Sequence, residues 1–306
     1  MKKATFPRMG QYTEVFEYIA ERLGYEPVTP PKSTQETIKL GVRHSSDMIC
    51  FPFKATLGNL IQGLEKGADT IIVTGTNPNE RNKETCRFGF YYHIQEQILR
   101  RLGYQFDTKY LHFGPSLLKD FRTSPAHLGL VKSLGFMRDV YRRAKEIEER
   151  EFKFEPSDIN LGVVGEAFTL WSEEVNYDMI RKLKGMGVGV DMSITLSHFL
   201  AHHVGLADEK KHLKKEVQKY FPKRIGGHGL ESITNTIDYA HKGFDGVIHL
   251  MPLSCMPEST VEMVLNMISE DYNIPIYRFP IDENNFEVGV STRTSTFVKI
   301  LRRNKG

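Results

Sequence analysis

The alternation of short apolar runs with amphipathic helical patterns constrains the fold of this chain more than any other feature. Residues 70–74, Thr-Ile-Ile-Val-Thr, form a continuous β-branched run, which is typical of a buried parallel strand. Helical patterns flank it at residues 54–66, closed by Gly67, and at residues 91–102. Strands that alternate with helices predict parallel sheets covered by helices, which is an α/β fold.

The same alternation returns after a region that is punctuated by prolines. Pro115, Pro125 and Pro156 lie in this region, together with a long helical pattern from Leu130 to Arg150. Further strand-like runs are found at residues 159–164, 188–192, 246–251 and 275–279. We therefore expect a first α/β domain at 1–115, a helical connector at 116–157 and a second α/β domain at 158–306.

Charge and hydropathy exclude several classes of protein. The chain has 41 Lys and Arg residues against 38 Asp and Glu residues, with a formal net charge of +3, which is too balanced for a nucleic-acid-binding surface. No apolar run approaches the roughly 20 residues that a membrane span needs, and the N-terminus lacks the apolar core of a signal peptide. We expect a cytoplasmic protein that binds neither nucleic acid nor a membrane.

The three cysteines are the strongest candidate site residues. Cys50, Cys86 and Cys255 are an odd number and lie far apart in the chain, which argues against a disulfide scaffold. Each is expected directly before a helix, at the sheet edge where ligands of open α/β folds bind, and helix N-termini favour thiolates. Three thiolates suit an iron–sulfur cluster or zinc; the alternative is that the cysteines are small hydrophobic residues in the core.

Three other residues are candidates for a role beside the cysteines. Arg87 would pair with the charge of a cluster or a substrate, or form a surface ion pair of little energetic effect. His228, in the Gly-rich loop 226–229, would donate a proton near the site, or lie in an ordinary turn. Glu166 would act as an acid or base, or support a ligand, or cap a helix.

Five blocks of sequence resemble those of a known family. They are CFPFKATLGN at 50–59, EKGADTIIVTG at 65–75, CRFGFYY at 86–92 with QEQIL at 95–99, GGHGLES at 226–232, and HLMPLSCMPE at 249–258. Together they resemble the 2-hydroxyacyl-CoA dehydratase subunit superfamily, most closely its branch of acyl-CoA dehydratase activase-related and double-cubane-cluster proteins. The polar stretch 76–85 departs from the pattern, because relatives often carry a short Gly-rich turn there.

The resemblance implies a fold and a cofactor. It implies two flavodoxin-like α/β domains, joined here by the helical connector, and a homodimer or heterodimer. It implies that Cys50, Cys86 and Cys255 are ligands of a [4Fe-4S] cluster or of half an [8Fe-9S] double cubane.

It also implies an activity in anaerobic metabolism. An ATP-hydrolysing activase of the actin/Hsp70 type would supply low-potential electrons, since this chain has no P-loop of its own. The chain would then reduce or dehydrate a small-molecule or acyl-CoA substrate, with His228 and Glu166 handling protons. The alternatives are a non-enzymatic cluster-bearing electron relay or scaffold subunit, and a zinc-binding structural protein.

Overall fold

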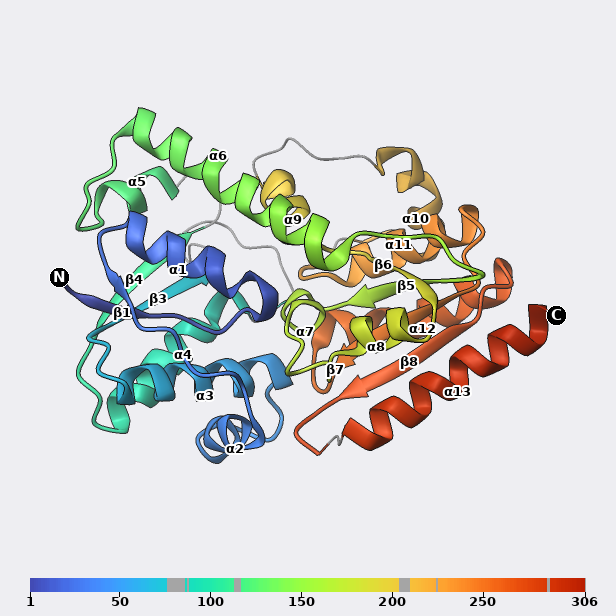
Figure 1. Cartoon of the computed structure of the whole chain (residues 1–306), viewed down its shortest axis with the longest axis horizontal. Helices are drawn as coiled ribbons and strands as arrows, with labels where there is room; N and C mark the ends of the chain where they lie inside the picture. The colour runs from blue at the N-terminus through green and yellow to red at the C-terminus, as the bar shows by residue number, and fades with distance from the viewer. Residues whose placement is uncertain are drawn as a thin grey trace. The chain divides into compact units, whose positions relative to one another are not determined.

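The computed structural model describes residues 1–75, 86, 88–112, 117–203, 210–223, 225–284 and 287–305. These residues form two compact units (Figure 1). The first unit comprises the described residues of 1–83, 87–147 and 196–206. The second comprises Cys86 and the described residues of 148–195 and 207–306.

The first unit is built on a parallel sheet of four strands in the order β2-β1-β3-β4. The strands are β1 (Lys3–Thr5), β2 (Glu26–Pro27), β3 (Thr70–Gly75) and β4 (Asp107–His112). The longest pairing joins β3 to β4, from Thr70 beside Asp107 to Gly75 beside His112. The chain moves from β1 to β2 on one side and then crosses to β3 on the other, so the strand order reverses between β1 and β3. In open α/β sheets this reversal marks the usual ligand-binding edge.

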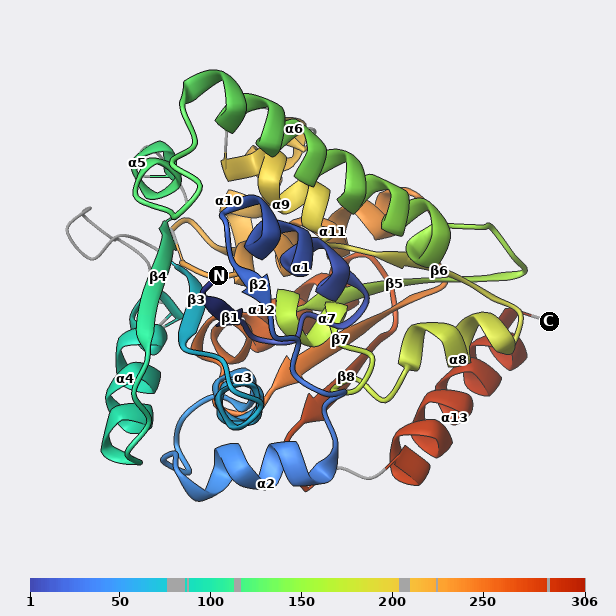
Figure 2. The ribbon, with the colours of Figure 1, turned by 60° about the vertical axis from the view of Figure 1, so that its left-hand side comes forward.

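The helices of the first unit include one pair that touches backbone to backbone. They are α1 (Thr13–Arg22), α2 (Gln35–Arg43), α3 (Phe51–Glu65), α4 (Phe88–Arg101), α5 (Leu117–Arg122), α6 (Leu130–Ile147) and α9 (Leu196–His203). Figure 2 shows α2 beside α3. A Cβ on Gly41 would lie 1.7 Å from the carbonyl oxygen of Lys54, and one on Gly58 would lie 2.0 Å from that of Thr37. The two glycines therefore permit this close helix packing.

The second unit repeats the design with a parallel sheet in the order β6-β5-β7-β8. Its strands are β5 (Ile159–Gly165), β6 (Val188–Met192), β7 (Gly246–Pro252) and β8 (Ile276–Ile281). Its helices are α7 (Ala167–Trp171), α8 (Met179–Gly185), α10 (Lys214–Tyr220), α11 (Gly229–His241), α12 (Met256–Asp271) and α13 (Glu287–Lys305). The order reverses between β5 and β7, so the C-terminal ends of these two strands are the candidate ligand-binding edge of this unit.

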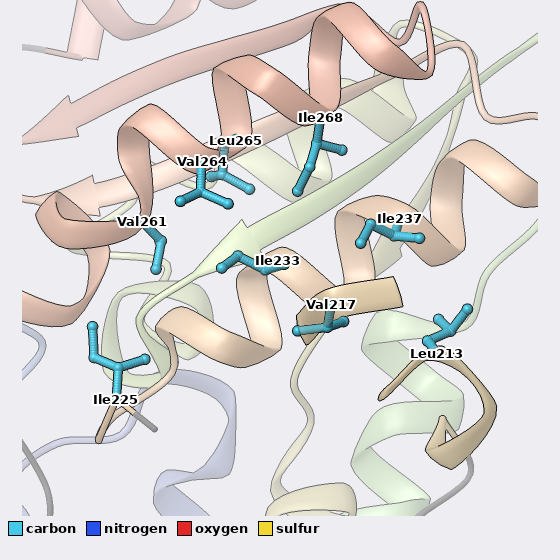
Figure 3. Close-up of a cluster of buried hydrophobic side chains, with 9 residues drawn as sticks. All are labelled: Leu213, Val217, Ile225, Ile233, Ile237, Val261, Val264, Leu265 and Ile268. Atoms are coloured by element: carbon cyan, nitrogen blue, oxygen red, sulfur yellow. The ribbon is translucent and has the colours of Figure 1, made fainter. Parts of the chain in front are cut away.

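An apolar cluster fixes α11 against α12 in the second unit. Figure 3 shows its nine buried side chains, with Ile233 and Ile237 of α11 in the same cluster as Val261, Leu265 and Ile268 of α12. Burying one side chain of this size contributes roughly 1.5–3 kcal/mol. The cluster therefore holds the two helices, and with them their N-terminal ends, in a fixed arrangement.

The predicted fold class is confirmed, because both sheets are all-parallel, are flanked by helices and form two flavodoxin-like domains. The sequence from Ser172 to Leu183 also has a helical pattern and predicts one helix, but this prediction is wrong in part, because a helix forms only from Met179 onward. Tyr177 and Asp178 have φ values of 58° and 56°, and this left-handed backbone separates the short helices α7 and α8. Within the described ranges, no helix is long and apolar enough to cross a membrane.

Candidate functional site

Cys255 lies in a tight connection between β7 and α12. Its backbone N–H donates to the carbonyl oxygen of Pro252 at 3.0 Å, and Ser254 inside this turn has a φ of 62°. Cys255 is the N-cap residue of the 16-residue helix α12, and Pro257 lies in the first turn, where proline is preorganised for a helix start. The thiol makes no capping hydrogen bond. It therefore lies at the electropositive end of a long helix, which favours a thiolate.

Cys86 lies against the beginnings of two helices of the second unit. A Cβ on Gly227 would lie 3.1 Å from Cβ of Cys86 and 2.8 Å from Cγ of Pro257. A Cβ on Gly229 would lie 2.8 Å from the carbonyl oxygen of Pro257. The glycines of the loop 226–229 thus allow Cys86 and the first turn of α12 to approach the first turn of α11. Two helix N-termini, one of them carrying Cys255, meet beside Cys86.

Cys50 occupies the same kind of position in the first unit. It is the N-cap residue of α3, with Pro52 in the first turn and without a capping hydrogen bond from its thiol. The local pattern Cys-x-Pro is thus shared by Cys50 and Cys255, and each of the two cysteines is buried. Lys54 follows one turn later, is 2% exposed, and donates from Nζ to the carbonyl oxygen of Asp47 at 3.4 Å.

Cysteine thiolates are the donor type that a soft metal or an iron–sulfur cluster takes, but the structure does not group the three cysteines. Cys86 and Cys255 lie near helix N-termini of the second unit, and no disulfide involves any of the three cysteines. Within the part of the chain that the structure describes, no three His, Cys, Asp or Glu residues are grouped so that they could hold a metal ion. The predicted location before a helix is confirmed for Cys50 and Cys255. The role of the three cysteines as ligands stays a prediction.

His228, predicted to handle protons, is the N-cap residue of α11 and lies among carboxylates. Its Nδ1 is 3.4 Å from Oε2 of Glu231. Burial alone would lower the pKa of His228, but the contact with Glu231 and the charges of Glu166 and Glu258 outweigh burial and raise this pKa to about 9. His228 is therefore a cation at neutral pH. The charge of Glu166, the other residue predicted to handle protons, contributes to the raised pKa of His228, so the two groups interact electrostatically.

Glu166 follows β5 directly and caps α7. Its carboxylate accepts hydrogen bonds from the backbone N–H groups of Phe168 and Thr169, both at 3.0 Å, and from the Thr169 hydroxyl at 2.9 Å. Burial raises the pKa of Glu166, while the charge of His228 and these hydrogen bonds act in the opposite direction. The helix-capping interpretation thus accounts for the contacts of both carboxylate oxygens.

A buried polar group on the helix that Cys255 begins was missed by sequence reasoning. Glu258, on α12, accepts with one oxygen, Oε2, from the Ser232 hydroxyl at 2.9 Å and contacts Nε2 of His249 at 2.8 Å. All three residues are 0% exposed. A histidine in the middle of an apolar strand and a glutamate three residues after a cysteine were the available signals, and both stand in the block at 249–258.

A second histidine–carboxylate pair in the first unit was also missed. Oδ2 of Asp120 lies 3.0 Å from Nδ1 of His112 and accepts from the backbone N–H of the same residue at 2.8 Å. The pair joins the end of β4 to α5. No local pattern in the sequence signals it, because the two residues belong to different elements.

Two sequence predictions lie outside the described residues. These are the role of Arg87 and the part played by the polar stretch 76–85.

Comparison with known protein families finds a match over much of the chain. Residues 7–194 match the family model described as the CoA enzyme activase uncharacterised domain (DUF2229). The match covers more than half of the 306 residues. The comparison with curated proteins gives no match.

Proposed function

We propose that this chain, which belongs to the family of the CoA enzyme activase uncharacterised domain, is an iron–sulfur redox protein. In this proposal an ATP-dependent activase supplies it with low-potential electrons. The chain then acts in the reduction or dehydration of an acyl-CoA or a similar small molecule. The family description supports an association with activase-dependent CoA enzymes, and the cysteines support the redox centre.

Cys86 lies close to the first turn of α12, the helix that Cys255 begins, and this proximity is the main support for the proposal. Gly227 has a φ of 70° and no side chain, and it separates Cys86 from Pro257 by the width of one backbone. A core-filling role for these cysteines would not require two glycine-dependent close approaches at the same point. Thiolates next to helix N-termini suit an anionic, sulfide-rich cluster.

The proposed ligands are Cys50, Cys86 and Cys255, as the family resemblance implies. When bound, such a cluster would supply one-electron transfer at low potential. The chain's own residues would do the rest. His228, held as a cation by its carboxylate neighbours, would balance negative charge or give a proton to a leaving oxygen. Glu166 would hold the start of α7 at the sheet edge through its capping bonds.

The first test measures iron and acid-labile sulfide per chain after anaerobic purification or reconstitution. We expect about four of each per chain, as in a cubane cluster, with large losses in Cys50→Ala, Cys86→Ala and Cys255→Ala. Met256→Ala is the matched control, because Met256 is exposed and follows Cys255 directly. Stoichiometric zinc without sulfide, or neither metal, would contradict the proposal.

A second test separates an enzyme from a relay. The reduced, cluster-loaded chain is mixed with a 2-hydroxyacyl-CoA, and formation of the enoyl-CoA is followed. Turnover by the chain alone supports the enzyme. Turnover only after a catalytic partner is added would instead assign the relay or scaffold role.

A further inference from the structure

The helix α6 of the first unit exposes a line of apolar side chains. Leu130, Val131 and Leu134 are 59%, 82% and 57% exposed, and Tyr141 further along the helix is 40% exposed. Single exposed apolar residues are ordinary. Leu130, Leu134 and Tyr141, however, recur at helical spacing and therefore lie on one side of α6, with the partly buried Met137 between them. Their spacing gives α6 an apolar line outside the core.

The opposite side of α6 is fixed to the rest of the first unit. Figure 2 shows α5 beside the beginning of α6. The ring of Phe136 packs edge-on against Phe121 of α5 with the centroids 5.0 Å apart, and lies 6.0 Å from the ring of Tyr18 on α1. The Tyr18 hydroxyl donates to Asp139 at 3.3 Å, and the guanidinium of Arg143 lies 4.0 Å from the centroid of the Tyr18 ring. These contacts hold α6 in place, so the apolar line is a preorganised surface.

The charges beside the apolar line are mainly basic. The helix carries five Lys and Arg residues against one Asp and one Glu. Arg138 and Arg142 follow Leu134 at intervals of one turn, and their side chains are 82% and 65% exposed. Asp139 lies 3.8 Å and 3.6 Å from these two guanidinium groups, and Glu146 lies 3.9 Å from that of Arg142. Exposed pairs of this kind contribute little, so positive charge dominates this side of α6.

Gly135 is a second, independent feature of the same helix. It lies inside α6, where glycine is less favourable than alanine. A Cβ at Gly135 would meet no atom within 4 Å, so no contact among the described residues explains the missing side chain. A glycine at a surface allows another backbone to come close. Gly135 therefore suits a helix that packs on α6 from outside.

We propose that this side of α6 is a docking face for an acidic, amphipathic helix of a partner protein. The docking face consists of Leu130, Val131, Leu134, Gly135, Arg138, Tyr141 and Arg142. Apolar side chains of the partner pack along the apolar line, and its Asp or Glu side chains pair with the two guanidinium groups. The inference goes beyond the proposed function and involves none of the three cysteines.

Charge and the glycine favour this occupant over two others. A second copy of the chain would bring the arginines of two docking faces together, and like charges across an interface are unfavourable. An anionic membrane would attract the arginines as well. The absent side chain at Gly135 matters for a helix that packs close to the α6 backbone, however, and adds nothing to the binding of lipid.

The test uses the full chain and a synthetic peptide as the probe. The peptide is a helix as long as α6, with leucine at every third or fourth position and glutamate beside these leucines. A second peptide carries glutamine in place of each glutamate. Fluorescence anisotropy measures both affinities. We expect the acidic peptide to bind about tenfold more tightly than the glutamine peptide, and to lose affinity as the salt concentration rises.

Three variants of the docking face and one control locate the contact. Leu134→Ser and Arg138→Glu should each weaken binding of the acidic peptide about tenfold. Gly135→Ala should stabilise the chain and yet weaken binding about fivefold, because the added methyl group holds the partner helix away. Ile300→Ser removes an exposed apolar side chain from α13 and should leave binding unchanged.

Three results would overturn the inference. One is no binding of the acidic peptide, or equal affinities of wild type, Leu134→Ser and Arg138→Glu for it. Another is dimerisation of the chain that Leu134→Ser abolishes, without peptide binding, which would assign the face to a second copy. The third is binding to phosphatidylglycerol vesicles without peptide binding, which would assign it to a membrane. Each of these leaves the proposed function to its own test, the iron and sulfide content.

Discussion

Gly227 lies directly against Cys86, and a Cβ at Gly227 would come within 3.1 Å of Cβ of Cys86. The same Cβ would also press on the ring of Pro257, at 2.8 Å. Gly227 has a φ of 70°, which residues with side chains rarely adopt. This one position thus joins Cys86 to the start of α12, and no larger residue can do so without a shift.

We predict that Gly227→Ala lowers the free energy of unfolding by roughly 2–3 kcal/mol, since it combines backbone strain with a steric clash. Chemical denaturation measures this change. Gly187→Ala is the matched control: Gly187 has a φ of 72°, but its nearest neighbour is a flexible arginine end at 3.8 Å. That variant should lose only about 1 kcal/mol. Equal losses in the two variants would argue against a tight contact at Cys86.

At Ser254, a substitution by glycine is expected to change the free energy of unfolding in the opposite direction. Its φ of 62° lies in the left-handed region, where glycine carries no steric cost. Ser254→Gly should therefore raise the free energy of unfolding by up to about 1 kcal/mol, and Ser254→Val should lower it by a similar amount or more. Thermal denaturation checks both. Ser259→Gly, inside α12, should be destabilising; stabilisation there too would point to a cause other than the turn.

The raised pKa of His228 predicts a pH-dependent stability. The folded chain binds this proton with a pKa of about 9, against an ordinary value of 6.5. Its stabilising contribution is complete below pH 6.5 and disappears as the pH rises through 9, because the folded state holds the proton more tightly than the unfolded chain. The free energy of unfolding should therefore fall across this window, by at most on the order of 3 kcal/mol.

His228→Gln should flatten that fall, as measured by urea denaturation at several pH values between the two limits. The control variant His212→Gln removes an exposed histidine of the same unit. It should show the same fall in the free energy of unfolding as the wild type. The same slope in His228→Gln and wild type would show that the carboxylates around α11 do not hold a proton on His228.

Much of the fold follows from local sequence patterns. The runs that became β3 and β7 are continuous and apolar, and a strand buried on both faces needs no distant information to be recognised. The three-residue strand β1 is too short for such a pattern. The break at Tyr177 and Asp178 was also not predictable, because neither residue is a glycine, the residue that most readily adopts a left-handed backbone.

The site was predictable only in part, for a related reason. Cys50 and Cys255 each begin a helix with proline in its first turn, and this local pattern is readable in the sequence. The approach of Cys86 to Gly227 joins distant segments, and the contact of Glu258 with His249 depends on how α12 packs on β7. Such contacts are set by the packing of whole elements, for which no local pattern exists.

The helix α3, which Cys50 caps, packs on α2 through Gly41, and the same chemical change at two helical glycines tests this contact. Gly135→Ala in α6 meets nothing within 4 Å, so it should raise the free energy of unfolding by up to about 1 kcal/mol through helix propensity. Gly41→Ala in α2 would place its Cβ 1.7 Å from the carbonyl oxygen of Lys54 in α3, and should lower it by about 3 kcal/mol or more. Denaturation curves of both variants test this.

Because α3 would have to move away from α2, Gly41→Ala should also reduce iron uptake, whereas Gly135→Ala should not. Similar stabilities for the two variants would mean that α2 and α3 do not pack backbone to backbone, and that Cys50 is held by other contacts.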